Sequence, residues 1–365
     1  MVRFDLGKIV LNLVFLILIV IAYLSRDWIY QAHIDETIKY LSSDGYVYFR
    51  AFDERFRNVD LAEDWYSLRR SSPAALLILA EGNLFAVQML NLALMYLTMR
   101  TAIGSLSTNV GKMTFLFCSL VFPYYAFGFL SLNKEVYAMC SAIFFGIYLI
   151  RQKFVYFLIS LLLAATARYF MIASILMLFL IIPRRKEPRF FLALMILVGI
   201  SLVAPVIRGL VPDYTAENLT DTGGASSVFF DTIVQNYGYA FLYPFKYVMM
   251  MLLRPYGYLI GSTHDAIGAA VSALSFVAAG IVAWMWLGKR TLTPLVRRLA
   301  MAGVVAPIPI MWSEITHWRY YSFVYFFFLF AIILQREAER RQRRASSRGG
   351  TPSPSTAVPS LEPQR

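Results

Sequence analysis

The chain has 365 residues, of which 59% are hydrophobic and only 15% are charged, and its formal net charge is +12. About a quarter of the residues in a soluble globular domain are charged, so the composition excludes an ordinary soluble protein. The positive charge alone would suggest nucleic-acid binding. In a membrane protein, however, Lys and Arg collect in cytoplasmic loops, and we expect no nucleic-acid partner.

Apolar segments recur along the chain and predict an all-α, polytopic membrane protein. In chain order they cover residues 9–25, 74–97, 113–130, 136–150, 154–182, 190–208, 266–287, 299–312 and 320–335. The stretch 228–262 is also apolar and aromatic, but it contains Lys246, Arg254 and two prolines. We expect a membrane domain over 1–335 and a basic, disordered cytoplasmic tail over 336–365, because REAERRQRR leads into a Ser- and Pro-rich end.

The first apolar run resembles a secretory signal peptide, because Arg3 and Lys8 precede it. The residues that follow it are SRDW, which contain no small-x-small cleavage site. We therefore expect an uncleaved first span.

The charges of the connections predict their side of the membrane. Basic residues mark the connections that we assign to the cytoplasm, together with both termini: Arg3 and Lys8, Arg100 and Lys112, Arg151 and Lys153, Arg184 to Arg189, Lys289 to Arg298, and the tail. In the connection 26–72 acids outnumber bases, and residues 209–231 carry four acids and no Lys or Arg. Loops 26–72 and 209–264 are therefore expected outside, with the protein in an inner or plasma membrane.

Arg168 lies at the midpoint of the apolar run 154–182, between the basic flanks RQK and PRRK. A single crossing would put these flanks on opposite sides of the membrane, against the charge pattern. Half of the run is fourteen residues, which as a helix span about 21 Å of the roughly 30 Å hydrocarbon core. We therefore expect a short, re-entrant-like hairpin with Arg168 at its tip, below the outer surface.

The basic clusters before and after the stretch 228–262 are expected on the same side of the membrane. The stretch itself must therefore cross the membrane an even number of times, zero or two. We favour zero crossings, with the stretch as a helix lying in the outer interface. The fold expected is then all-α, with about ten membrane helices, two of them short, and a long first outer loop.

This topology brings polar residues from five distant segments to the outer side. An arginine this deep in an apolar run costs at least about 2.5 kcal/mol, so Arg168 is a functional candidate by default. Clustered Arg and Lys at a recessed membrane site suit a phosphate or diphosphate. The candidate phosphate ligands are Lys134, Arg168, Arg254 and Arg319.

The phosphate of a lipid-linked sugar sits at this depth, so we expect the remaining candidates to act on the sugars of such a substrate. Asp44 would serve as a general base that removes a proton from an acceptor hydroxyl. Arg and Lys would stabilise the charge that develops on the departing lipid phosphate. The candidate substrate contacts are Tyr48, Glu135, Tyr256, His317 and Tyr320.

Three features resemble the GT-C superfamily of integral-membrane glycosyltransferases and the related polymerases of bacterial surface polysaccharides. They are an acid beside tyrosines in a long first outer loop (SSDGYVYF), a hairpin of half-spans that carries an arginine (LLLAATARYFMIASILML), and a late outer turn with an Arg-Tyr pair (HWRYYSF). The turn SLNKE is similar to outer turns of exopolysaccharide-cluster polymerases. The resemblance covers roughly residues 1–335, as a pattern.

The resemblance implies a GT-C-like fold and a polymerase or glycosyltransferase. Its substrates would be polyprenyl-phosphate- or diphosphate-linked sugars at the extracytoplasmic face, in the assembly of exopolysaccharide, capsule or O-antigen. The partners implied are a lipid-linked sugar donor, a glycan acceptor, membrane lipid and other polysaccharide-assembly proteins.

The acidic residues depart from the GT-C pattern. The catalytic carboxylate of those enzymes often belongs to an acidic pair near the start of the first outer loop, whereas Asp44 lies well along it. Asp35-Glu36 and Asp53-Glu54 therefore remain alternatives for the base. The three histidines are scattered and no DxD-type spacing stands out, so we expect no metal site and no cofactor. A divalent cation on Asp44 and another acid stays open.

Two other functions compete with glycosyl transfer. A transporter or flippase for a lipid-linked glycan usually shows internal repeats and polar groups near the midplane. We find no repeat, and the polar groups favour one face. In a non-enzymatic membrane assembly factor, Arg168 would be structural.

The hairpin makes a direct prediction about topology. Cysteines introduced as Glu187→Cys and Arg340→Cys should both be labelled by a membrane-impermeant maleimide only when the cytoplasmic side is exposed. Labelling of the two positions from opposite sides would contradict the hairpin.

Overall fold

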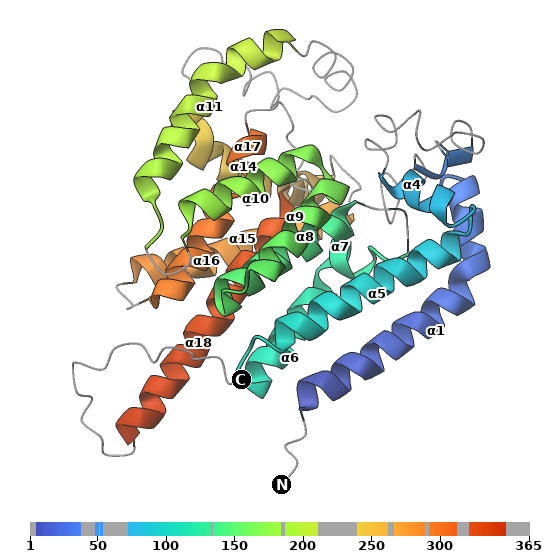
Figure 1. Cartoon of the computed structure of the whole chain (residues 1–365), viewed down its shortest axis with the longest axis horizontal. Helices are drawn as coiled ribbons and strands as arrows, with labels where there is room; N and C mark the ends of the chain where they lie inside the picture. The colour runs from blue at the N-terminus through green and yellow to red at the C-terminus, as the bar shows by residue number, and fades with distance from the viewer. Residues whose placement is uncertain are drawn as a thin grey trace.

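The computed structural model describes residues 5–37, 48–50, 52–53, 72–130, 132, 134–183, 187–210, 239–261, 266–288, 292–311 and 321–347. All regular structure in these residues is helical, which confirms the all-α class. In Figure 1 the long helices α1 (Leu6–Ile34) and α5 (Leu84–Ile103) run side by side along one flank.

The other helices follow in chain order. They are α4 (Ser72–Leu79), α6 (Asn109–Val121), α7 (Pro123–Ala126), α8 (Glu135–Arg151), α9 (Phe154–Ala167), α10 (Tyr169–Ile181), α11 (Phe190–Leu210), α14 (Tyr239–Leu259), α15 (Ala266–Leu287), α16 (Pro294–Val305), α17 (Ile308–Met311), the 3-10 helix η5 (Ser322–Val324) and α18 (Tyr325–Ser347).

Helix α8 is the centre of the molecule, because its residues from Glu135 to Leu149 are all buried. It packs against α5, α9, α16 and α18. A helix that is apolar on every face belongs in an interior. Gly146 admits the Phe330 ring of α18 so closely that a Cβ would come within 2.8 Å of it. On the α9 side, Ser141 and Ser160 each donate a hydroxyl to the other's carbonyl, at 2.7 and 2.8 Å. Small residues of this kind let two helices approach closely.

Apart from the predicted hairpin, three of the expected apolar segments, 74–97, 113–130 and 299–312, are each divided between two α-helices. The run 74–97 divides into α4 and α5, which meet at 116°. Glu81 and Gly82 adopt positive φ angles of 51° and 80°, and Asn83 caps α5 by accepting from the Ala86 N–H. The run 299–312 divides into α16 and α17, and Pro307, which has no backbone N–H to donate, lies between them.

Several helices are apolar enough to associate with a membrane. By length and composition two helices of the described chain, α1 and α15, could cross one, or three if the bent pair α4–α5 counts as a single span. Shorter apolar helices include α6, α9 and residues 170–181 and 190–202. Large apolar side chains are exposed on α1, α11 and α15, among them Leu24, Phe191 and Trp284. Exposed apolar surface of this extent marks a face that lipid or protein covers.

Residues 154–182 form a hairpin with Arg168 at its tip. Arg168 is extended (φ −160°, ψ 143°) between α9 and α10. Near the other end of the hairpin the rings of Phe157 and Phe179 lie 4.4 Å apart, so the two helices run back on each other. The structure thus has the predicted helical hairpin, and its depth in a membrane stays a prediction.

The stretch 228–262 contains helix α14, and its residues 228–238 lie outside the described chain. This helix packs on α15, and the Tyr247 hydroxyl donates to the Gly303 carbonyl of α16 at 2.9 Å. The helix agrees with the expected secondary structure. Its place in the outer interface stays a prediction.

Opposite Arg168, the described residues of the basic connections meet at one end of the molecule, which we call the basic end. Lys112 donates to Asp5 at 2.7 Å and thereby lowers the pKa of that carboxyl. The Arg151 guanidinium lies against Gly104. Arg297 and Glu187 form an ion pair at 3.1 Å. Helices α1, α5, α6, α8, α11 and α16 therefore all have one terminus at this end.

Helix α18 continues to Ser347, so the expectation of a disordered tail from residue 336 is wrong for residues 336–347. The buried Glu337 carboxylate explains the extension. It accepts the N–H and hydroxyl of Thr108, at 2.9 and 2.7 Å, and the hydroxyl of Ser107 at 2.5 Å. A Cβ on Gly111 would collide with it. The carboxylate thus lies at the N-terminus of α6, where the helix dipole favours an anion.

We predict that Glu337→Ala lowers the free energy of unfolding by about 2 to 3 kcal/mol, because it leaves part-buried donors unsatisfied. Thermal unfolding of the detergent-solubilised protein measures the effect. The control is Asp27→Ala, which removes an exposed carboxylate that pairs with Arg26 at the surface and should cost no more than about 1 kcal/mol. Equal losses would contradict an anchoring role for Glu337.

Candidate functional site

The start of α8 positions two of the predicted site residues. Lys134 precedes the helix and Glu135 is its first residue. The Glu135 side chain is only 4% exposed. A carboxylate at a helix N-terminus interacts favourably with the helix dipole.

The tip of the α9–α10 hairpin brings Arg168 to Glu135. Nη2 of Arg168 lies 2.7 Å from Oε1 of Glu135, and the arginine side chain is 13% exposed. The guanidinium also lies 5.8 Å from the centre of the Phe170 ring. A charge-assisted contact of this length holds the guanidinium in one orientation.

Lys134 contacts a residue of the segment that we expect to be the first outer loop. Its ammonium lies 5.0 Å from the centre of the Tyr48 ring, in cation–π geometry. We call Tyr48, Lys134, Glu135 and Arg168 the Arg168 cluster. The structure therefore brings together four predicted site residues from three segments that are distant in sequence.

For most of the other predicted residues the structure describes no side chain. Asp44, His317, Arg319 and Tyr320 lie outside the described residues, and so does the Arg254 side chain. Tyr256 is on α14 and is 62% exposed.

Of the alternative bases, Asp35 accepts from Gln31 at 2.9 Å and Glu36 lies 3.6 Å from Arg50. Glu54 falls outside the described chain, whereas Asp53 falls within it. The identity of the base stays a prediction.

Sequence reasoning missed a buried polar layer close to the cluster. The Tyr137 hydroxyl donates to Asn91 at 2.6 Å, and the Gln88 amide donates to the Leu130 carbonyl at 2.9 Å. The Gln88 contact thereby supports the chain just before the turn that carries Lys134. The available signal was the spacing of Gln88 and Asn91, which puts two amides on one face of an apolar helix. Lys246 of α14, a residue of the stretch 228–262 to which sequence reasoning assigned no role, is 3% exposed.

The arrangement suits the binding of an anion better than acid–base chemistry by Glu135. The Glu135 carboxylate is buried and already contacts the guanidinium of Arg168, so it is suited to orient that guanidinium. Arginine and lysine held at one recessed position can bind phosphate oxygens. Within the described residues no three His, Cys, Asp or Glu side chains group closely enough to hold a metal ion.

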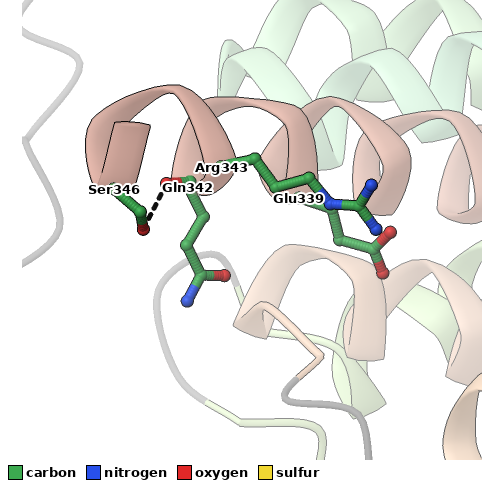
Figure 2. Close-up of a pocket in the computed structure, with 4 residues that line it drawn as sticks. All are labelled: Glu339, Gln342, Arg343 and Ser346. Atoms are coloured by element: carbon green, nitrogen blue, oxygen red, sulfur yellow. Dashed lines mark hydrogen bonds between the residues drawn. The ribbon is translucent and has the colours of Figure 1, made fainter. Parts of the chain in front are cut away.

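A separate hollow of about 570 Å³ lies at the other end of the molecule, on the last turns of α18 (Figure 2). Glu339, Gln342, Arg343 and Ser346 line it, and the Ser346 hydroxyl donates to the Gln342 carbonyl. These residues belong to the exposed extension of α18 beyond Glu337. They share no element with the Arg168 cluster, and we assign the hollow no part in its chemistry.

Comparison of the chain with protein-family models, with curated proteins and with solved structures found no match.

We predict strong coupling between Arg168 and Glu135 in a double-mutant cycle. Glu135→Met should destabilise the protein by about 3 to 5 kcal/mol, because it leaves a buried guanidinium without its carboxylate. Arg168→Met together with Glu135→Met should cost at least about 1 kcal/mol less than the sum of the single changes.

Thermal unfolding in detergent measures all four proteins of the cycle. The control cycle is Arg297 with Glu187, whose side chains are 42% and 54% exposed. Its coupling should stay below about 1 kcal/mol. Additive effects at Arg168 and Glu135 would show that the pair does not constrain the hairpin.

Proposed function

We propose that the chain is a membrane-embedded glycosyltransferase or polysaccharide polymerase with a GT-C-like arrangement. It acts on polyprenyl-phosphate- or diphosphate-linked sugars at the extracytoplasmic face, in the assembly of a cell-surface polysaccharide. The observation that carries the proposal is the 2.7 Å contact between Arg168 and Glu135, with Lys134 one residue away.

The depth of the cluster supports a lipid-linked substrate. The fourteen residues of α9 span about 21 Å as a helix, so a tip joined to a short hairpin lies within reach of headgroup phosphates. Arg168 and Lys134 hold the phosphate of the donor and stabilise the charge that grows on it as the glycosidic bond breaks. Glu135 is a positioning residue, because it holds the guanidinium in place before the substrate arrives.

The first outer loop supplies the acceptor side. Tyr48 already contacts Lys134 in the described part of this loop, and its ring offers a stacking face for a sugar. Asp44, four residues earlier in the sequence, removes the proton from the acceptor hydroxyl. The oxygen then attacks the anomeric carbon, and the lipid phosphate leaves.

The proposal includes multi-pass insertion with about ten crossings and both termini in the cytoplasm. Support comes from the candidate spans α1 and α15, from the bent pair α4–α5 and from the shorter apolar helices. The basic end supports it further, because the positive-inside rule places such an end in the cytoplasm and the Arg168 cluster outside.

The test is glycan synthesis by purified protein in lipid vesicles, with a polyprenyl-linked oligosaccharide as donor. Arg168→Ala should lower kcat/KM by about 100-fold or more, and Asp44→Asn by about 100-fold to 10,000-fold. Glu135→Gln should keep the shape of the site but orient Arg168 less well, and we expect about a tenfold loss with a raised KM for the donor.

The matched control is Arg100→Ala, at the basic end of α5, where the guanidinium lies near Tyr96. It should leave turnover unchanged. Thermal unfolding identifies any variant that has simply lost its fold. If the protein moves intact lipid-linked glycan across the bilayer and forms no glycosidic bond, the proposal fails and a flippase is the better answer.

A further inference from the structure

A groove of about 670 Å³ lies at the basic end of the α9–α10 hairpin, opposite Arg168. Its lining comes from α8, α9, α10 and the segment that leads into α11: Tyr148, Phe154, Phe179, Leu180, Pro183 and Arg189. Neither the proposed transfer reaction nor the Arg168 cluster uses these residues.

The walls of the groove are aromatic and partly open. The Phe179 ring lies 6.1 Å from the ring of Tyr148 and 6.3 Å from that of Phe154. Phe154 is 46% exposed and Leu180 is 55% exposed. The next residues of the chain after Arg189, Phe190 and Phe191, are also largely exposed. The groove therefore continues onto apolar surface that faces hydrocarbon in a membrane protein.

The rim of the groove is positively charged. Arg189 is exposed, and its Nη1 lies 3.5 Å from the Leu180 carbonyl near the end of α10. Two arginines of α16 approach the same segment, since Arg297 is 3.1 Å from Glu187 and Arg298 is the next residue of the helix. The rim thus holds the exposed Arg189 and the ion-paired Arg297, where an apolar groove meets the basic end.

We infer that this groove binds an anionic phospholipid of the surrounding leaflet. An acyl chain lies against Phe154, Phe179 and Leu180, and the phosphate lies at Arg189. Basic pockets between membrane helices on the cytoplasmic side bind lipid headgroups by this combination of contacts. The inference does not depend on the proposed transferase activity, because the two sites lie at opposite ends of the hairpin.

Native mass spectrometry of the full chain in detergent tests the inference, with phosphatidylglycerol and phosphatidylcholine of equal chain length as probes. We expect one tightly retained phosphatidylglycerol, bound at least about fivefold more tightly than phosphatidylcholine. Arg189→Gln should weaken phosphatidylglycerol binding about fivefold to tenfold and remove the preference. Arg189→Lys should restore part of it.

Filling the groove provides a second, independent variant. Leu180→Trp should weaken both lipids, whereas Leu162→Trp, at a 67% exposed position of α9 outside the groove, should change neither. Arg343→Gln removes an exposed charge of the basic end outside this groove and should leave the preference intact.

Three results would overturn the inference. The first is equal weakening by Arg343→Gln and Arg189→Gln, which would mean a diffuse attraction to positive charge. The second is equal retention of the two lipids by the unaltered protein. The third is displacement of phosphatidylglycerol by a tenfold lower concentration of polyprenyl phosphate, which would make the groove a second site for the donor lipid. The unfolding temperature of each variant separates these results from loss of the fold.

Discussion

The complete burial of helix α8 is the constraint on which the arrangement of both ends depends. A helix surrounded by α5, α9, α16 and α18 cannot shift along its axis without disturbing each contact, among them the close fit of Gly146 to Phe330. Its first turn therefore holds Glu135 at a fixed depth, and its last turns hold Tyr148 beside α16. The candidate anion site lies at the N-terminal end of α8, and the basic end of the molecule lies at its C-terminal end.

The hairpin beside α8 follows from helix length. Fourteen and thirteen residues in α9 and α10 span only about 20 Å each, so neither helix fills a hydrocarbon core of roughly 30 Å. A chain that turns back at this depth leaves backbone and side-chain polar groups in need of partners. Arg168 meets that need with Glu135, and the Ser141–Ser160 contact locks the first half of the hairpin onto α8.

The hairpin could be predicted from the sequence, whereas the ion pair between Arg168 and Glu135 could not. The flanks RQK and PRRK with a midpoint arginine are local signals that any positive-inside argument can use. The Glu135–Arg168 contact joins residues 33 positions apart, and no periodicity encodes which carboxylate an arginine will meet. The break between α4 and α5 could have been predicted from Gly82 and Asn83, since both residue types favour helix ends. The extension of α18 could not have been predicted in this way. It depends on contacts of the buried Glu337 with Ser107 and Thr108, some 230 positions away in the sequence.

The Arg168–Glu135 pair is better explained by position than by stability. Two charges removed from water gain little over well-packed apolar side chains of similar volume, so a buried pair is weak evidence of a stabilising role. What the pair does supply is a fixed direction for the guanidinium, at a depth where an unpaired arginine would snorkel toward water. A site that must recognise a phosphate at one depth requires that direction before the substrate arrives. Glu135, at the start of α8, can hold the guanidinium in this direction, because the helix that carries it is packed on all sides.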